Sequence, residues 1–181
     1  MENHTLDRVT IETGANPTAA VVWLHGLGAD GHDFEPIIPE LGLEEVGPIR
    51  FVFPHAPIRS VTINNGMEMR AWYDILEISI DRKVDEEGIT ASAKLVETLL
   101  TEQIEAGISP RRLILAGFSQ GAAMAYHVGL KQNHPLAGIL VLSGYLPLSE
   151  SLQAPTDPDS PLTSILCCHG NWDPVVPVAL G

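Results

Sequence analysis

Residues 113–125 read Leu113-Ile114-Leu115-Ala116-Gly117-Phe118-Ser119-Gln120-Gly121-Ala122-Ala123-Met124-Ala125. An apolar run about one strand long leads through Gly-x-Ser-x-Gly into small residues that suit a helix. This order predicts a strand, a sharp turn and a helix, with Ser119 at the apex of the turn as a nucleophile. Glycines on both sides would let strand and helix approach closely, and the backbone N–H of Gln120 would be free to bind an anionic oxygen. The alternative is an ordinary strand-to-helix turn.

Composition and charge limit the classes of function. The 181 residues suit a single domain, residues 1–181, and 45% of them are hydrophobic. The net charge of −13 argues against nucleic acid or an anionic membrane surface as a partner. The sequence shows no signal-peptide pattern and no apolar run that could span a bilayer, so we expect a cytoplasmic protein. Cys167 and Cys168 are adjacent in an apolar run and are expected to be buried thiols.

The rest of the chain alternates between strand and helix patterns. Strands are predicted at residues 6–12, 19–24, 49–53, 136–142 and 164–168, and helices at 34–41, 85–106 and 120–130. This alternation predicts a mostly parallel α/β sheet with helices on both faces. Residues 58–81 show no clear period and are expected to form a functional loop, and residues 153–161 a surface loop.

Candidate catalytic residues follow the predicted strands, at the edge where such sheets bind ligands. A serine nucleophile needs a base, usually an imidazole that a carboxylate orients. Asp173 follows Ser119 in the chain order serine, then acid, and is the candidate orienting acid. The alternative is that Asp173-Pro174 only begins a turn.

An oxyanion hole needs two donors, and the glycine-rich loop after residues 19–24 can supply the second. We expect the N–H groups of Gln120 and Leu27 to be these donors, although the loop could also be a plain turn. Trp72 has two interpretations, the wall of an acyl pocket or an aromatic side chain packed on the core. The histidine spacing fits no zinc pattern, so no metal site is expected. His127 is expected at the surface or at a helix end, and His169 is expected to bond backbone groups near Asp173.

Four motifs occur together and in order along nearly the whole chain: Leu24-His25-Gly26-Leu27-Gly28, Ala71-Trp72-Tyr73-Asp74-Ile75, Gly117-Phe118-Ser119-Gln120-Gly121 and His169-Gly170-Asn171-Trp172-Asp173-Pro174-Val175-Val176-Pro177. The set resembles the phospholipase/carboxylesterase family of α/β-hydrolases, which includes acyl-protein thioesterases and small bacterial carboxylesterases. The stretch 61–72 looks most like the bacterial branch. The resemblance implies an α/β-hydrolase fold, Ser119 as nucleophile, Asp173 as triad acid, and Leu27 and Gln120 as oxyanion donors. It implies ester, thioester or lysophospholipid substrates, no cofactor and, for some members, homodimers.

One departure from the family pattern matters. In the family the triad histidine follows the acid after one more strand, with a final helix behind it, and here no histidine follows Asp173. We therefore expect a C-terminally truncated member that lacks the last strand and helix, and that is poorly active and unstable. Residues 164–168 would then form an apolar, unpaired edge strand. The alternatives are a non-catalytic binding domain derived from an esterase, or His25 or His169 acting as a substitute base.

Overall fold

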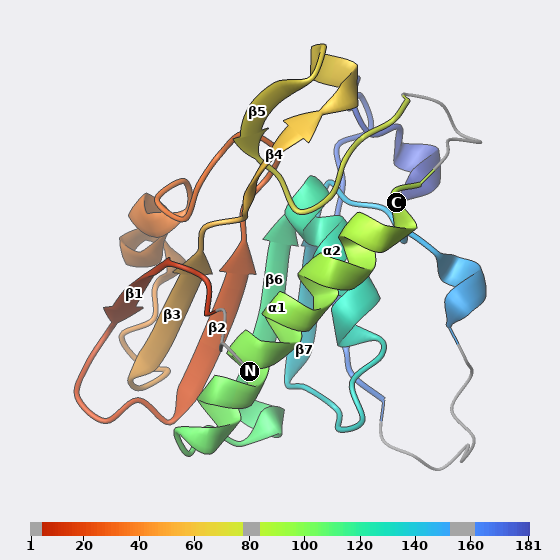
Figure 1. Cartoon of the computed structure of the whole chain (residues 1–181). Coiled ribbons are helices and arrows are strands. Elements are labelled where there is room, and N and C mark those ends of the chain that lie inside the picture. The colour runs from red at the N-terminus through yellow and green to blue at the C-terminus, as the bar shows by residue number, and fades with distance from the viewer. Residues whose placement is uncertain (1–4, 78–83, 153–161) are drawn as a thin grey trace.

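The structure is a computed structural model that describes residues 5–77, 84–152 and 162–181. Its main sheet has six strands in the order β1-β3-β2-β6-β7-β8 (Figure 1). Only β1 is antiparallel to its neighbour, and the other pairings are parallel. The strands of this sheet are β1 (Arg8–Glu12), β2 (Ala19–Leu24), β3 (Ile49–Pro54), β6 (Leu113–Phe118), β7 (Gly138–Leu142) and β8 (Ile165–Cys168).

The described residues also form two α-helices and several 3₁₀ helices. They are α1 (Glu86–Glu105), α2 (Gln120–Gly129), η1 (Glu35–Leu41), η2 (Thr62–Asn64), η3 (Pro110–Arg112), η4 (Ser149–Ser151) and η5 (Val178–Leu180). The predicted helix at 34–41 is the 3₁₀ turn η1, because Pro36 and Pro39 interrupt α-helical hydrogen bonding there. The predicted helix at 85–106 is α1, which begins where the Asp85 side chain accepts a hydrogen bond from the Gly88 N–H.

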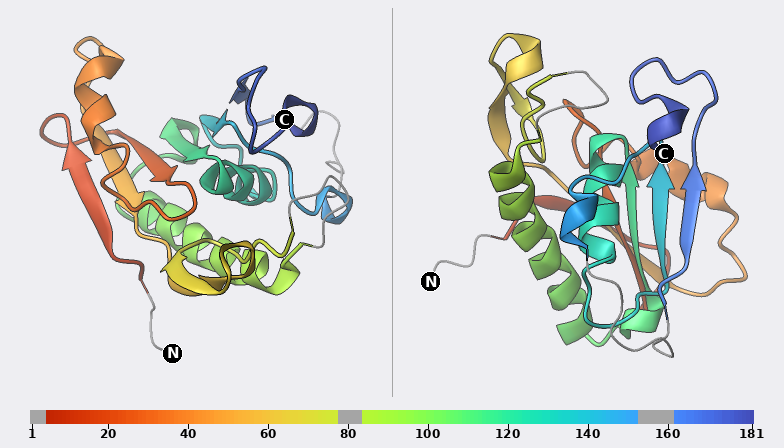
Figure 2. Two further views of the ribbon diagram at one scale, coloured as in Figure 1. Left: turned by 90° about the horizontal axis from the view of Figure 1, so that it is seen from above. Right: turned by 90° about the vertical axis from the view of Figure 1, so that its right-hand side faces the viewer.

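Both faces of the sheet are covered, and this explains the continuous apolar strands. On β2, Val22 and Leu24 belong to the core that α1 and α2 cover, while Val21 and Trp23 belong to a second core under η1. Successive residues of a strand point to opposite faces, so a strand between two cores is apolar throughout. Figure 2 shows α1 and η1 on opposite sides of the sheet. The predicted α/β sheet is confirmed.

The stretch 58–81 contains regular structure that its sequence pattern does not indicate. It forms a hairpin of β4 (Ile58–Val61) and β5 (Met67–Arg70), which stands beyond the end of the sheet toward which β6 points (Figure 1). Both strands are only four residues long, too short for a clear alternation of apolar and polar residues. The prediction of a loop was therefore wrong for residues 58–70. Residues 78–83 and the predicted surface loop at 153–161 lie outside the described residues.

One prediction about burial was also wrong. Cys167 and Cys168 are exposed, because β8 is the last strand in the sheet order and all four of its residues are exposed. The expectation of an apolar edge strand at 164–168 agrees with this arrangement. His127 lies in the last turn of α2, which is the helix-end alternative, and is 3% exposed there, so it is not a surface residue. None of the described helices is long and apolar enough to cross a membrane.

The elbow glycines allow a direct test of the packing between α2 and β2. A Cβ on Gly121 would lie 2.3 Å from the Leu24 carbonyl oxygen. We expect Gly121→Ala to lower the free energy of unfolding by about 1–3 kcal/mol, because backbone must move to admit the methyl group. Gly170→Ala is the control, since a Cβ there meets nothing within 4 Å. Urea unfolding of both variants measures the difference, and equal stabilities would contradict the expected clash.

Candidate active site

The turn at Ser119 has the strained geometry that its glycines suggest. Ser119 lies between β6 and α2 with φ 53° and ψ −114°, in the positive-φ region that L residues rarely adopt. A Cβ on Gly117 would lie 2.2 Å from the carbonyl oxygen of Gly121. The two glycines therefore pack backbone against backbone, and this contact holds the serine at the carboxyl end of β6, at the start of a helix.

The loop after β2 lies against this turn. A Cβ on Gly26 would be 3.6 Å from the Cβ of Ser119, so the start of this loop lies against the serine. Within the described ranges, neither the Leu27 N–H nor the Gln120 N–H has a hydrogen-bond acceptor. Gln120 is the first residue of α2, and the first N–H groups of a helix have no acceptor within it. Open backbone donors of this kind are what an oxyanion hole requires.

Residues 25–31, which we call the oxyanion loop after the role expected of Leu27, are held by hydrogen bonds from neighbouring segments. The Gly28 N–H donates to the Arg70 carbonyl oxygen at 2.9 Å, and the Gly31 N–H donates to His55 Nδ1 at 3.0 Å. His55 and Arg70 carry no motif signal. His55 follows directly after β3, which was predicted, whereas the hairpin that ends at Arg70 was not predicted, so no sequence signal pointed to this role.

His25 has both ring nitrogens engaged. Its Nε2 accepts from the Ala56 N–H at 3.0 Å, so its proton is on Nδ1, which donates to the Gly26 carbonyl oxygen at 2.7 Å. Burial is the main cause that lowers the pKa of His25, and the imidazole is 1% exposed. This geometry does not suit a substitute base for Ser119, because Nε2 would have to leave the Ala56 N–H to accept a proton.

Trp72 lies in the core, which is the second of the two roles that its sequence context allowed. The indole is fully buried, and its Nε1–H donates to the His25 carbonyl oxygen at 2.9 Å. The Gln120 side chain joins the same network: its Oε1 accepts from the Trp72 N–H at 2.8 Å, and its Nε2 donates to the Tyr73 carbonyl oxygen at 2.7 Å. Trp72 thus packs in the core and bonds the start of the oxyanion loop at His25.

Asp173 sits in a turn after β8 with one carboxylate oxygen fully occupied. Its Oδ1 accepts from the N–H groups of Val176 and Val175, each at 2.9 Å. Both bonds lower the pKa of Asp173, and the bond from Val176 has the larger effect. The carboxylate is therefore ionised at neutral pH. His169 Nε2 donates to the Val176 carbonyl oxygen at 2.8 Å and lies 3.8 Å from Asp173 Oδ2. His169 therefore bonds backbone near Asp173, as expected.

Ser119 and Asp173 follow strands on the same edge of the sheet, with β7 between β6 and β8. Two strand spacings amount to roughly 10 Å, a separation compatible with one imidazole that bonds both groups. In the part of the chain that the structure describes, the Ser119 hydroxyl has no hydrogen-bond partner, and no group of three His, Cys, Asp or Glu side chains could hold a metal ion. The geometry can thus supply a nucleophile, two oxyanion donors and an orienting carboxylate.

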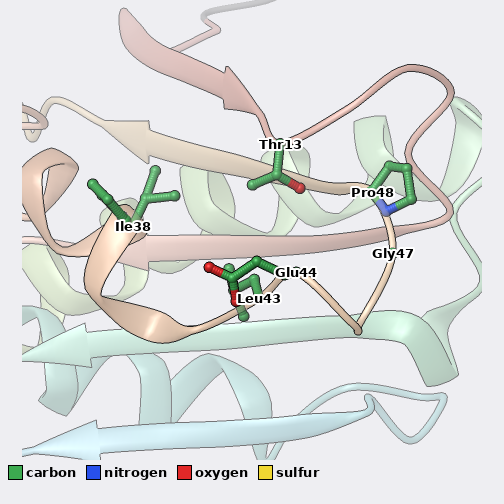
Figure 3. A pocket seen from close by; sticks show the side chains of 7 residues that line it. Thr13, Ile38, Leu43, Glu44, Gly47 and Pro48 are labelled. Atoms are coloured by element: carbon green, nitrogen blue, oxygen red, sulfur yellow. The ribbon is translucent and has the colours of Figure 1, made fainter.

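A cavity of about 390 Å³ lies at the other end of the sheet (Figure 3). Its lining includes Thr13 and Pro48, next to the end of β1 and the start of β3, together with residues 38–47 around the end of η1. Ligands of parallel α/β sheets bind at the carboxyl ends of the strands, so this cavity is separate from the candidate site.

The carboxamide of Gln120 can be tested apart from its backbone N–H. Gln120→Glu replaces the donor to the Tyr73 carbonyl oxygen with a second acceptor in a buried position. We expect a loss of about 1–3 kcal/mol in the free energy of unfolding, because a buried acceptor is left unpaired. Gln103→Glu is the matched control, since buried Gln103 accepts from Arg50 Nη1 and a carboxylate would keep that bond. Denaturant titration compares the two, and an equal loss in both variants would contradict the assigned role.

Comparisons with known proteins find relatives that match most of the chain. The acyl-protein thioesterase 1 of Gibberella zeae is 38% identical over 173 residues, which are 91% of this chain and 73% of the relative. That of Yarrowia lipolytica is 35% identical over 93% of this chain and 75% of the relative. The crystal structure of Arabidopsis thaliana SOBER1 superposes with a TM-score of 0.82 at 32% identity, covering 90% of this chain and 78% of that one. Zea mays acyl-protein thioesterase 2 has a TM-score of 0.80 at 30% identity, covering 96% and 80%.

The match to a family is equally extensive. The sequence matches the phospholipase/carboxylesterase family over residues 6–181, which includes every described element of the fold and every candidate site residue. Together with relatives more than 30% identical, this match shows that the chain belongs to the phospholipase/carboxylesterase family, whose members are hydrolases of the esterase and thioesterase kind.

Proposed function

We propose that the chain is a serine carboxylic-ester hydrolase that works through an acyl-enzyme at Ser119. The observation that carries the proposal is the strained serine, with φ 53°, at the start of α2, against the loop that holds Leu27. The N–H groups of Gln120 and Leu27 are both open. Such donors stabilise the anionic oxygen of a tetrahedral intermediate, and the loss of one commonly costs about 10²–10³ in kcat. A plain strand-to-helix turn also has open N–H groups at the helix start, but it does not need a serine with positive φ.

In the proposed reaction the Ser119 oxygen attacks the acyl carbonyl carbon, and a base takes the hydroxyl proton. The carbonyl oxygen becomes an oxyanion between the Leu27 and Gln120 N–H groups. Collapse of this intermediate breaks the bond to the alcohol or thiol, which leaves with the proton, and water then releases the acid by the same two steps. Asp173 is the group that orients the imidazole base, and its lowered pKa keeps it anionic for that task.

The proposed mechanism requires a base, and this chain does not supply an evident one. No histidine follows Asp173, and both ring nitrogens of His25 are engaged. We infer that these 181 residues by themselves turn over esters slowly. Loss of one triad member in a serine hydrolase can lower kcat by up to about 10⁶, while the oxyanion hole and binding retain roughly 10³–10⁴ over water.

The substrate class follows from the relatives and from the site. Two relatives are named acyl-protein thioesterases, so we propose acyl thioesters and acyl oxyesters, including lysophospholipids, as substrates. The proposed mechanism needs no metal or cofactor. The negative charge of the chain does not favour nucleic acid as a partner.

Fluorophosphonate labelling, read by intact mass and peptide mapping, tests the proposal. We expect slow modification at Ser119, lost in Ser119→Ala and kept in Ser164→Ala, the exposed control at the start of β8. Added imidazole should accelerate labelling, since it can serve as the absent base, and Asp173→Asn should weaken that acceleration. A folded sample that is not labelled, with or without imidazole, would contradict the proposal and favour a non-catalytic binding domain.

A further inference from the structure

The oxyanion loop is clamped to one short segment that follows β3. The Gly31 N–H donates to His55 Nδ1 at 3.0 Å, and the neighbouring Ala56 N–H donates to His25 Nε2 at 3.0 Å. His25 opens the loop and Gly31 closes it, so residues 55 and 56 hold its two ends. Between them lie Leu27, the proposed oxyanion donor, and Gly28, which the Arg70 carbonyl oxygen holds.

We propose that His55 is a positioning residue of the oxyanion hole, which fixes the Leu27 N–H beside Ser119 through its bond to Gly31. This inference rests on the proposed function, because it assigns a task to the Leu27 N–H. His55 touches neither Ser119 nor the reacting atoms. It acts only through the backbone of the loop.

The packing at Gly31 leaves little freedom to replace this bond. Gly31 is buried, and a Cβ on it would lie 2.3 Å from the Phe53 carbonyl oxygen and 3.1 Å from His55 Cε1. The loop end is therefore pressed against the last residues of β3. This N–H lies in a part-buried position, and if it loses its acceptor the loop must shift for it to find another partner.

The bond requires a neutral His55. A backbone N–H can only donate, so Nδ1 must be unprotonated and the ring proton must be on Nε2. Burial, then Arg70 and also His32, whose ring centroid is 5.6 Å away, lower the pKa of His55. Asp30 and Asp7 oppose this shift but do not reverse it.

The direction of the pH effect follows from that lowered pKa. The folded chain binds a proton at His55 less readily than the unfolded chain does, so the bond contributes fully above the ordinary value of 6.5. The contribution is lost as the pH falls through the lower pKa of the folded state. Acid would therefore release Gly31 and loosen the oxyanion loop.

Two substitutions of His55 test its role as a hydrogen-bond acceptor separately from its protonation. In His55→Asn the side-chain Oδ1 can take the place of Nδ1 and accept from the Gly31 N–H, but it does not titrate. In His55→Leu the acceptor is absent. His32→Asn is the control, because exposed His32 bonds the Glu35 carboxylate and accepts from no backbone N–H of the loop.

The first measurement is a ¹⁵N–¹H NMR titration of the unsubstituted chain and the variants. We expect the Gly31 and Leu27 amide signals to move together with a midpoint below pH 6.5 in the unsubstituted chain and in His32→Asn. In His55→Asn this transition should be absent. A Leu27 signal that keeps its position in His55→Leu, while Gly31 moves, would sink the proposal, because His55 would then act on Gly31 alone.

The second measurement is the rate of Ser119 phosphonylation with imidazole present. At alkaline pH we expect His55→Leu to react about tenfold more slowly than the unsubstituted chain, and His55→Asn to match it closely. Equal rates for His55→Leu would overturn the proposal. If Ser119 is labelled in no variant, the proposed function fails while the NMR titration still decides whether His55 positions Leu27. Should His55→Leu not fold, the presence of the coupled transition in the unsubstituted chain and its absence in His55→Asn decide.

Discussion

The site depends on one steric constraint, the contact of backbone with backbone where α2 meets the end of β2. Gly121 packs on the carbonyl oxygens of Leu24 and His25, and Gly117 packs on Gly121 itself. No side chain fits between these atoms, so the helix start and the oxyanion loop are held at the shortest distance that the backbone allows. Ser119 lies in the turn between β6 and α2 with strained dihedral angles. The packing around it must hold the backbone in that conformation.

A second constraint is the satisfaction of buried polar groups around this contact. Trp72, Gln120 and His25 exchange hydrogen bonds that leave no atom of the Gln120 carboxamide or the His25 ring unpaired. Buried networks of this kind are rigid when every member is satisfied. The proposed oxyanion hole uses the open N–H groups of Leu27 and Gln120 next to this network, because donors held in a rigid frame need no reorganisation when a charge develops beside them.

The protonation states of Asp173, His25 and His55 match the hydrogen bonds that these side chains make. Asp173 is anionic because two backbone N–H groups bond its Oδ1, while burial holds His25 and His55 in their neutral forms. A neutral imidazole can accept a backbone N–H, and a carboxylate can orient a cationic ring; neither could do so in its other protonation state. The same loops that bring the backbone donors together therefore also set which side chains are charged.

Local sequence determined much of this protein. The apolar runs of β2, β3 and β6 and the glycines around Ser119 predict the parallel sheet and the elbow, because strand burial and turn sterics depend on neighbouring residues. Contacts and burial that involve segments far apart in the sequence were decided only by the tertiary structure. It placed Trp72 in the core, exposed Cys167 and Cys168 on an edge strand, and brought His55 against Gly31. These outcomes depend on which strands become neighbours and which faces of the sheet are covered. The local hydrophobic pattern of the sequence does not determine either one.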